Sequence, residues 1–276
     1  MDYTPEFLDS RKIFSSSEED FLRSLVAQYP YETFLDNHRS FEERSIDYAY
    51  VSSKIEGNQY SRKGASMLLQ YGFTEAGKTY QDATMLVNLR DAFVNVTLSP
   101  NESIEKVLSK HFVCSIHSQV ASKLLETNDR GQVRNCAVTI SGTDYVPLKS
   151  SFALEQELSR LLATAREIEN PFEQAVYTHC NLAYLQYFQD GNKRVSRLMQ
   201  TAVMATHGLT PIFLQESSVH DYLASVVHYY ETGDFSAYAE LFLREYEHTI
   251  LQLQGKTKEQ LEAEERALES IARHGR

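Results

Sequence analysis

The sequence predicts an all-α fold that carries one short β-hairpin. Glycine (11) and proline (6) are scarce among the 276 residues, and most segments repeat apolar residues with the 3.6-residue period of a helix. Hydrophobic residues make up 42% of the chain and charged residues 24%, which is typical of a globular protein. The length suffices for one large domain with a substantial core, with additions at its ends.

Bulk charge and composition exclude several classes of partner. The net charge of −11 disfavours general nucleic-acid binding, which needs a basic surface, although a few arginines can still form a phosphate pocket. No run of 18 apolar residues predicts a membrane span, and the first residues do not resemble a secretory signal. Three widely spaced cysteines match no metal-ligand spacing, so we expect reduced thiols in a cytoplasmic protein (Cys114, Cys136, Cys180).

The first half of the chain is expected to be helical up to a single β segment. The stretch "FEERSIDYAYVSSKIEG" predicts a helix over residues 41–57 that ends at Gly57. In "RNCAVTISGTDYVPL", apolar residues alternate up to Ile140, a turn follows at residues 141–144, and Tyr145 and Val146 resume the strand pattern. An isolated hairpin is at best marginally stable, so we interpret this one as a lid or substrate platform on a helical body.

Four helices are expected in the second half. One apolar face runs through Phe172, Ala175, Val176, His179, Leu182, Ala183 and Gln186. A second helix runs from about Lys193 to His207, and two more are separated at residues 232–234. The tail from Thr257 opens with a Thr-x-x-Gln capping box. It predicts an exposed helix or a contact in a homodimer.

The stretch "DGNKRVSR" predicts a phosphate site. A glycine turn that leads into a helix presents free N–H groups and the positive end of the helix dipole. Arg194 and Arg197 are three residues apart, so both can face one anion, and Asp190 is placed to hold a phosphate-bridging Mg²⁺. The alternative is a capped surface helix with two solvated arginines, and the pattern alone slightly favours it because short motifs recur by chance.

A family resemblance favours the phosphate site. Residues 186–197, "QYFQDGNKRVSR", resemble the Fic family signature H-x-F-x-(D/E)-G-N-G-R-x-x-R. "AVYTHCNLAYLQ" is similar to the family helix before the signature, and "GQVRNCAVTISGTDYVP" resembles its G-x-x-R segment and hairpin flap. "VSSKIEGNQYSRKGASMLL" resembles the inhibitory Ser-x-x-x-Glu-Gly helix of one class of members. The order and spacing agree from about residue 40 to 250.

The resemblance implies a Fic-type helical bundle with a short β-hairpin flap. We expect an N-terminal helical region over 1–100 with the inhibitory helix at about 41–57. A Fic core follows over 101–250, and a C-terminal exposed helix over 251–276. Members mostly transfer AMP from ATP to a hydroxyl of a target protein, so ATP, Mg²⁺ and an unknown target protein are the implied ligands. No nucleic acid or membrane is expected as a partner.

The resemblance also assigns roles to residues. Asp190 would hold Mg²⁺, and Arg194 and Arg197 would bind the β- and γ-phosphates. The anion hole would be formed by Gly191, Asn192 and the following backbone amides, beginning with Lys193. Tyr222 would lie near the adenine, although a buried core tyrosine is an equal alternative. The flap would align the target chain by strand addition through Gly142, Thr143, Asp144, Tyr145 and Val146.

The N-terminal helix would supply the inhibitory group. In the family, the inhibitory glutamate pairs with the second arginine of the signature, so here Glu56 would pair with Arg197 and exclude the productive γ-phosphate position. Ser52, one turn earlier, would steady the end of the helix. The alternative is a solvated salt bridge that contributes well under about 1 kcal/mol.

The sequence departs from the signature at its catalytic position. Gln186 replaces the family histidine, and its neutral amide cannot act as a general base, a role typically worth about 10²–10⁴-fold in rate. Tyr187 replaces the usual proline and Lys193 the last glycine, which indicates natural divergence; the lysine also occurs in Doc-type kinases and is expected to keep a phosphate contact. His179 is roughly 10 Å from Gln186 along the helix, so we expect a hydrogen-bonded core histidine rather than a substitute base.

Three functions therefore remain open from the sequence. The first is an adenylyltransferase relative that binds ATP·Mg²⁺ and transfers AMP weakly or not at all. The second is a nucleotide-binding pseudoenzyme or regulatory interaction protein, in which nucleotide sets the position of the Glu56 helix. The third, the weakest, is a de-AMPylating hydrolase that uses Glu56 to align water.

Overall fold

The computed structural model describes residues 1–98 and 102–255, and its regular elements are all helices. The elements are, in chain order, η1 Pro5–Asp9, α1 Ser16–Gln28, α2 Tyr31–Asp36, α3 His38–Ile55, α4 Arg62–Tyr71, α5 Tyr80–Thr97, α6 Ile104–Val107, α7 Lys110–Val120, η2 Thr127–Asp129, α8 Ser151–Arg166, α9 Pro171–Leu185, α10 Asn192–Thr206, η3 Glu216–Ser218, α11 Val219–Thr232 and α12 Ser236–Leu253. The all-α prediction is confirmed. None of the helices in these two ranges is both long and apolar enough to cross a bilayer.

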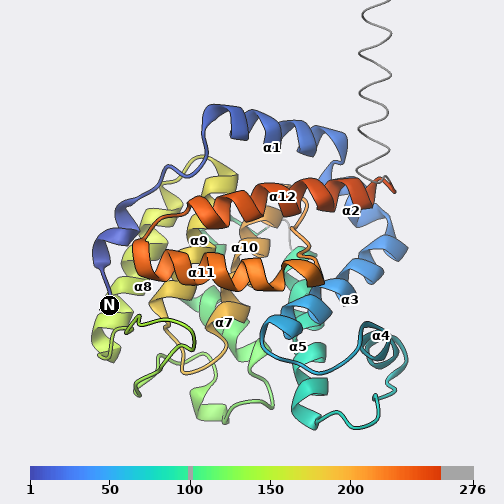
Figure 1. Cartoon of the computed structure of the whole chain (residues 1–276), viewed down its shortest axis with the longest axis horizontal. Helices are drawn as coiled ribbons and strands as arrows, with labels where there is room; N and C mark the ends of the chain where they lie inside the picture. The colour runs from blue at the N-terminus through green and yellow to red at the C-terminus, as the bar shows by residue number, and fades with distance from the viewer. Residues whose placement is uncertain (99–101, 256–276) are drawn as a thin grey trace, which may run out of the picture.

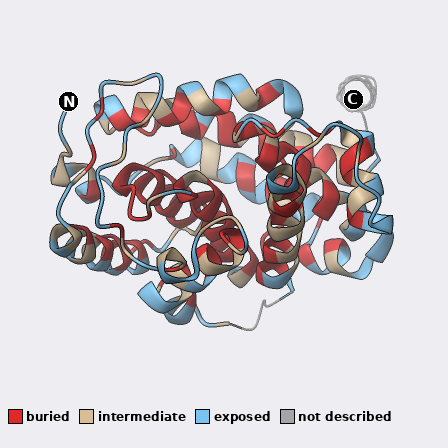
Figure 2. Cartoon of the chain, turned by 90° about the horizontal axis from the view of Figure 1, so that it is seen from below, coloured by how far each residue is buried: buried red, intermediate tan, exposed pale blue. Residues whose placement is uncertain are grey.

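Helices α9 and α10 form the centre of the molecule and pack on each other more extensively than any other pair of elements. Every residue of α9 from Phe172 to Leu185 is buried, as expected for a helix enclosed on all sides. Helices α11 and α12 lie side by side and antiparallel across this pair (Figure 1). Burial is concentrated in the central helices, and the outer ones bury one face (Figure 2).

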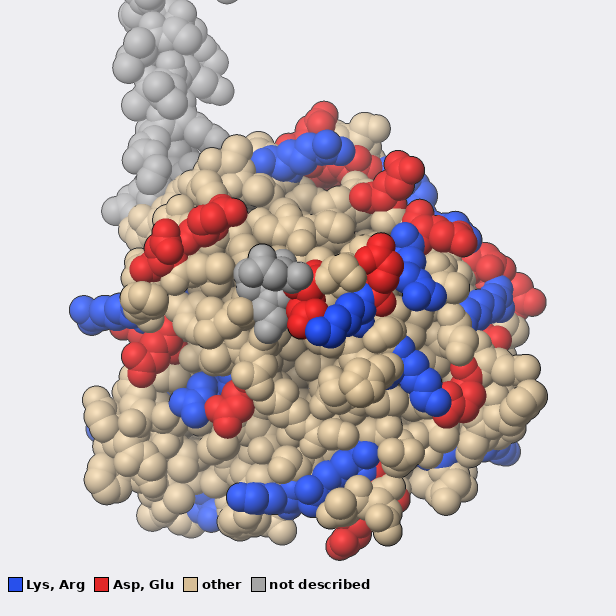
Figure 3. All heavy atoms as spheres, turned by 180° about the vertical axis from the view of Figure 1, so that it is seen from behind, with Lys and Arg blue, Asp and Glu red and all other residues tan. Residues whose placement is uncertain are grey.

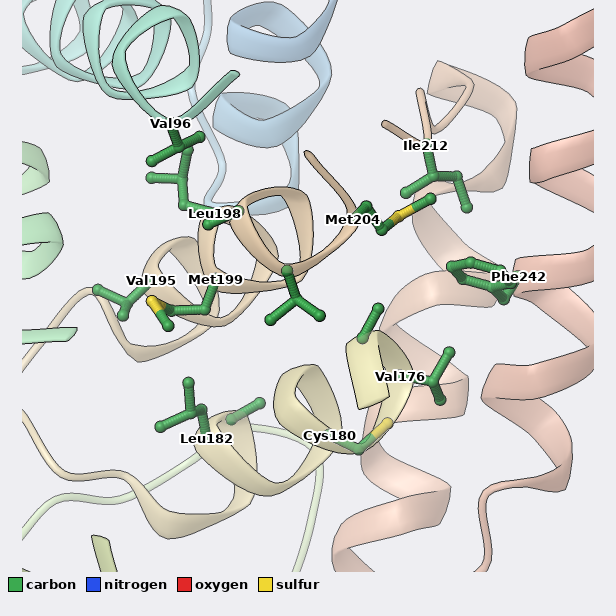
Figure 4. Close-up of a cluster of buried hydrophobic side chains, with 14 of the residues drawn as sticks. Val96, Val176, Cys180, Leu182, Val195, Leu198, Met199, Met204, Ile212 and Phe242 are labelled. Carbon is green, nitrogen blue, oxygen red and sulfur yellow. The ribbon is translucent and has the colours of Figure 1, made fainter. Parts of the chain in front are cut away.

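Side chains of α9 and α10 interlock in the core (Figure 4). Leu182 of α9 points toward the helix that carries Val195 and Met199, and Val176 of α9 points toward Phe242 of α12. Burying large apolar side chains of this kind is the main favourable contribution to folding. The turn between α9 and α10, which contains the signature, is therefore held at both ends by packed helices.

The helix predicted over residues 41–57 is present as α3, three residues longer at its start than predicted and ending at Ile55. It packs on α5 and touches α11. Glu56 is its C-cap residue, and Gly57 follows with φ +84°, a left-handed conformation that glycine adopts without strain.

The predicted β-hairpin is not formed. Among the described residues, no backbone hydrogen bond joins the two arms of residues 135–148, which we call the flap. The second arm pairs instead with the start of the chain, where Val146 N–H donates to the Met1 carbonyl at 2.8 Å and a parallel bridge joins Asp2 to Val146. Two short arms without a third strand gain too little to form a ladder alone, and side chains hold the flap in place.

The helices predicted for the second half are confirmed with small shifts in their ends. The second of them begins at Asn192 and ends at Thr206, and the last two are separated around Gly233 as predicted. The tail helix predicted from Thr257 lies outside the described residues.

On the face opposite to the view of Figure 1, basic and acidic side chains are interspersed (Figure 3), which is unlike the basic surface of a nucleic-acid-binding protein.

Candidate functional site

A polar cavity of about 390 Å³ lies where the α9–α10 turn, the end of α3, the flap and α11 meet. This volume is within the usual range for small-molecule sites. Its walls are Ile55 and Glu56 of α3, residues 138–141 of the flap, Gln186, residues 189–193 of the turn, and Leu223 and Tyr230 of α11. Six residues of the predicted site therefore line one cavity: Glu56, Gln186, Asp190, Gly191, Asn192 and Lys193.

The α9–α10 turn is closed by the side chain of Asn192. Its amide nitrogen donates to the Phe188 carbonyl at 2.7 Å, and its amide oxygen accepts from the Phe188 N–H at 2.9 Å. Gly191 precedes the helix with φ +77°. No side chain of the described residues caps this helix start, and residues 191–193 line the cavity. Uncapped N–H groups and the positive end of the helix dipole are the features of an anion hole.

Arg194 is buried and incompletely paired. Its Nη2 donates to Asp190 Oδ2 at 2.7 Å, whereas its Nε and Nη1 have no hydrogen-bond partner within the described structure. Buried donors without partners are rare and costly. These two N–H groups therefore indicate that an acceptor belongs beside Arg194.

Arg197 is held by the N-terminal helix. Its Nη2 donates to Glu56 Oε1 at 2.8 Å, and its Nε donates to Ser52 Oγ at 2.9 Å. The remaining Nη1 donates to the Tyr222 hydroxyl at 3.0 Å. Lys193 approaches the other Glu56 oxygen at 3.6 Å, so the carboxylate is held between two cations.

The pKa values of this ion pair favour its charged form. Burial would raise the pKa of Glu56, but Arg197, Lys193 and Arg194 outweigh burial and hold it below its usual value. Burial likewise disfavours the charged form of Arg197, but Tyr222 and Glu56 outweigh it and raise the pKa. Since the Arg197 side chain is only 5% exposed and that of Glu56 15% exposed, the pair is weakly screened by water.

Gln186 ends α9 in the left-handed conformation, with φ 50° and ψ 50°. Its amide nitrogen donates to the Ala183 carbonyl at 2.7 Å, and its amide oxygen accepts from Asn192 at 3.1 Å. The same nitrogen lies 3.4 Å from the Tyr230 hydroxyl. The side chain is thus fixed at the cavity wall by neutral hydrogen bonds, and nothing in this arrangement accepts a proton.

A buried histidine that the sequence reasoning missed, His117, contacts two residues of the turn. His117 of α7 stacks on Phe188 with ring centroids 3.7 Å apart. Gly131 N–H donates to its Nδ1 at 2.7 Å, so Nε2 carries the proton and donates to the Asp190 carbonyl at 3.1 Å. Desolvation lowers the pKa of His117 to about 4, which keeps the ring neutral. The signal was the Gly131 segment, which the resemblance had already singled out.

Tyr222 is not placed against the cavity, contrary to its expected position beside an adenine. It is 0% exposed and lies behind Arg197, where its hydroxyl accepts from that guanidinium and pairs with His179 Nε2 at 3.0 Å. The alternative, a buried core tyrosine, is the observed one, because the hydroxyl is needed to satisfy Arg197. On α11 the residues that line the cavity are Leu223 and Tyr230.

His179 is the core histidine that was predicted. It is fully buried and stacks on Tyr238 with ring centroids 4.3 Å apart. Burial and the nearby Arg197 lower its pKa well below the usual value. A ring in this position has no access to the cavity and cannot replace the missing base.

The flap residues divide between the cavity and the surface. Residues 138–141 line the cavity, whereas Gly142 and Asp144 are exposed at the turn. Thr143 Oγ1 donates to Glu231 of α11 at 2.6 Å. Tyr145 points inward and donates to the Tyr184 carbonyl at 2.8 Å.

These features define a class of protein. It is all-helical and has a turn suited to anion binding between its two central helices, and the arginine that follows this turn, Arg197, is held by Glu56 from an N-terminal helix. Residues 107–204 match the model of the Fic/DOC family. This segment is thus similar to the Fic/DOC family, and it lies within the core predicted over 101–250.

Curated relatives and solved structures agree with this similarity. The chain is 28% identical over 191 residues to a protein adenylyltransferase Fic of Nematostella vectensis, covering 67% of this chain and 43% of the relative. It is 25% identical over 242 residues to protein adenylyltransferase fic-1 of Caenorhabditis briggsae, covering 86% and 46%. The chain thus spans less than half the length of these relatives.

The fold is shared with solved structures of low sequence identity. A Fic family protein from Desulfovibrio desulfuricans matches with a TM-score of 0.72 at 14% identity, covering 92% of this chain and 77% of the other. Fic-1 of C. elegans, residues 134–508, matches with a TM-score of 0.70 at 21% identity, covering 87% and 72%.

Proposed function

We propose that this chain binds ATP·Mg²⁺ in the cavity at the α9–α10 turn, and that its transfer of AMP to a protein hydroxyl is weak or lost. The observation that carries the proposal is Arg194, whose buried Nε and Nη1 lack acceptors beside an uncapped helix start. A phosphate group supplies acceptors of the required charge and geometry. The names of the curated relatives, protein adenylyltransferases, support ATP as the nucleotide.

The residues around the cavity are suited to a Mg²⁺ ion that binds together with the nucleotide. Among the described residues no group of three or more His, Cys, Asp or Glu side chains could hold a metal. Mg²⁺ commonly binds through one or two carboxylates together with water and substrate phosphates. Asp190 would hold it, since its side chain lies beside the cavity and Arg194 outweighs the desolvation of this carboxylate and keeps its pKa below the usual value. When bound, the ion neutralises phosphate charge.

The Glu56 contact makes this site autoinhibited. Arg197 would bind the terminal phosphate, but its Nη2 is engaged by Glu56 at 2.8 Å. Lys193 is drawn to the same carboxylate. ATP must therefore displace Glu56 from two cations, or bind with its terminal phosphate elsewhere.

Gln186 favours nucleotide binding over transfer. A protein hydroxyl that attacks the α-phosphorus must lose its proton, and an amide held by Asn192 and Ala183 cannot take it. The cradle would still position and polarise the phosphates. We expect any residual AMP transfer to be at least about 10²–10⁴-fold slower than transfer by a site with histidine at this position.

The deciding experiment combines ATP titration by calorimetry with label transfer from α-³²P-ATP in the presence of Mg²⁺. Wild type is compared with Glu56→Gly, with Glu56→Gly/Gln186→His and with the control Glu56→Gly/Gln186→Asn, which introduces another neutral amide. Acceptors are the protein itself and a lysate of its host.

We expect ATP binding in Glu56→Gly and label transfer only when histidine is present at position 186. Transfer by Glu56→Gly alone would identify a restrained enzyme that does not need a histidine. Binding with no transfer in any variant would identify a site used for nucleotide binding only. Failure of all variants to bind ATP would overturn the proposal.

A further inference from the structure

The flap lacks a strand ladder, yet both its arms converge on one side chain. Arg134 is 3% exposed and lies immediately before the flap. Its partners are backbone carbonyl oxygens rather than carboxylates, which is unusual for a buried guanidinium because buried cations are normally paired with anions.

The three contacts of this guanidinium join three separate segments. Its Nη1 donates to the Cys136 carbonyl in the first arm at 2.7 Å, and its Nη2 donates to the Leu148 carbonyl at the end of the second arm. Its Nε donates to the Gln186 carbonyl at 2.6 Å. One planar group therefore closes the base of the flap and fixes it to the end of α9.

The backbone of Arg134 strengthens the same junction. Its N–H donates to the Tyr187 carbonyl at 3.1 Å, and its carbonyl accepts from Ser151 Oγ at the start of α8 at 2.7 Å. A positive group at the last carbonyls of α9 is also favourable with respect to the helix dipole.

We infer that Arg134 is a positioning residue that replaces the missing strand pairing of the flap and sets the distance between the flap and residue 186. The planar fork is essential to this role, because it directs separate N–H groups at three carbonyls at once. A lysine has its donors on a single nitrogen and cannot span them. That the flap positions a target protein rests on the proposed function. That Arg134 holds the flap at a fixed distance from residue 186 does not depend on the proposed function.

The test measures the position of the flap relative to α11 without any nucleotide. Nitroxide spin labels are attached at Ser141→Cys on the flap and Ala224→Cys on α11, both exposed positions, after Cys114 and Cys136 are replaced by serine. Distance distributions are recorded by pulsed electron–electron double resonance for the labelled protein with Arg134 and for its Arg134→Lys and Arg134→Met variants. Arg130→Lys is the matched control, since Arg130 also donates to a carbonyl, that of Leu125 at 2.8 Å, but outside the flap.

We expect a single narrow distribution with Arg134 and with Arg130→Lys, and a distribution at least twofold broader with Arg134→Lys and Arg134→Met. An unchanged width in a folded Arg134→Lys protein would overturn the inference. Loss of all helical structure in Arg134→Lys would also overturn it, because the role would then be global rather than confined to the flap.

ATP affinity separates this inference from the proposed function. The hydrogen bonds of Arg134 within the described structure reach none of the residues 190–197, so Arg134→Lys should bind ATP within twofold of the parent protein in a Glu56→Gly background. In the variant that also carries Gln186→His, Arg134→Lys should raise KM for the target protein without weakening ATP binding. If no variant binds ATP, the proposed function fails, while the measured flap distances still decide the role of Arg134.

Discussion

Glu56 is the residue whose protonation should be visible in the stability of the protein. Its pKa is held below the usual 4.5, chiefly by Arg197 and Lys193 acting against burial. A carboxylate with a lowered folded pKa stabilises the fold above its unfolded pKa, and the stabilisation is lost as pH falls through the folded value. Loss of the contact at neutral pH should cost about 1–3 kcal/mol.

We therefore expect Glu56→Gln to lower the free energy of unfolding by a nearly constant amount between pH 8 and 5, and by a shrinking amount below pH 4.5. Urea denaturation at a series of pH values measures the difference. Glu43→Gln on the same helix, where the side chain is 50% exposed, is the control and should change little. A Glu56→Gln effect that does not depend on pH would show that the charge is not involved.

Gly191 should be needed for anion binding as well as for the turn. Alanine is strained at its φ of +77°, at a cost of about 1–2 kcal/mol, and its methyl group would lie 3.5 Å from Arg194 Nη2. Gly208 has φ +65° with nothing within 4 Å of the added methyl.

Gly191→Ala and Gly208→Ala should thus lower the stability by similar amounts, but only the first should weaken ATP binding, by about tenfold or more. Calorimetry with the Glu56→Gly protein makes the comparison. Equal ATP affinities in the two variants would remove Gly191 from the anion site.

Sequence reasoning located the turn from Gln186 to Arg197 from a local motif, and the distant partner Glu56 from the family resemblance. Of these residues, Glu56, Gln186 and residues 189–193 line one cavity. Tyr222 was misplaced because its position depends on the direction of α11 relative to Arg197, which no local pattern contains. Arg134 received no role for the same reason, since the carbonyl groups of Leu148 and Gln186 that it binds lie 14 and 52 residues away in sequence.

At the scale of elements, helix α9 determines the position of the signature. Its N-cap Asn170 accepts from the N–H groups of Phe172 and Glu173 at 3.0 and 3.4 Å, and Pro171 occupies the first turn. Substituting such a cap by alanine costs about 0.5–2 kcal/mol.

Asn170→Ala should therefore lower the midpoint of thermal unfolding by several degrees, consistent with about 1 kcal/mol, and leave ATP affinity unchanged. Differential scanning calorimetry gives the first value and ATP titration the second. A large loss of affinity would mean that the start of α9 is coupled to its far end.

Helices were easier to predict than the flap for a physical reason. The break near Gly233 and the apolar face of α9 follow from local period and turn chemistry, which the sequence shows directly. The flap has alternating residues of strand type, but strand formation depends on a partner strand. Here the partners are the start of the chain and a side chain, so the alternation alone predicted the wrong structure.

At the scale of the whole molecule, buried neutral histidines should make the protein sensitive to mild acid. Desolvation lowers the pKa values of His117 and His179 below 6.5, that of His117 to about 4. In the unfolded chain these groups take up protons near pH 6.5, whereas the folded protein does not. Stability therefore rises with pH between about 4 and 6.5 and is fully present above 6.5.

We expect wild type to lose several kcal/mol of stability between pH 6.5 and 4. The slope of the unfolding free energy against pH should be smaller for His117→Gln, by the amount that corresponds to about one proton taken up on unfolding. Equilibrium urea unfolding at closely spaced pH values gives the slopes. Identical slopes for the two proteins would show that His117 titrates alike in the folded and unfolded states.

The backbone around residue 186 has a consequence for the history of this gene. The left-handed end of α9 and the Arg134 contact involve main-chain atoms of Gln186, and histidine is among the residues that adopt this conformation readily. Glutamine codons differ from histidine codons at a single nucleotide. A single base change would thus place histidine, which can accept a proton, at a position whose main-chain conformation it adopts readily, and the frequency of histidine among natural alleles would measure whether selection tolerates it.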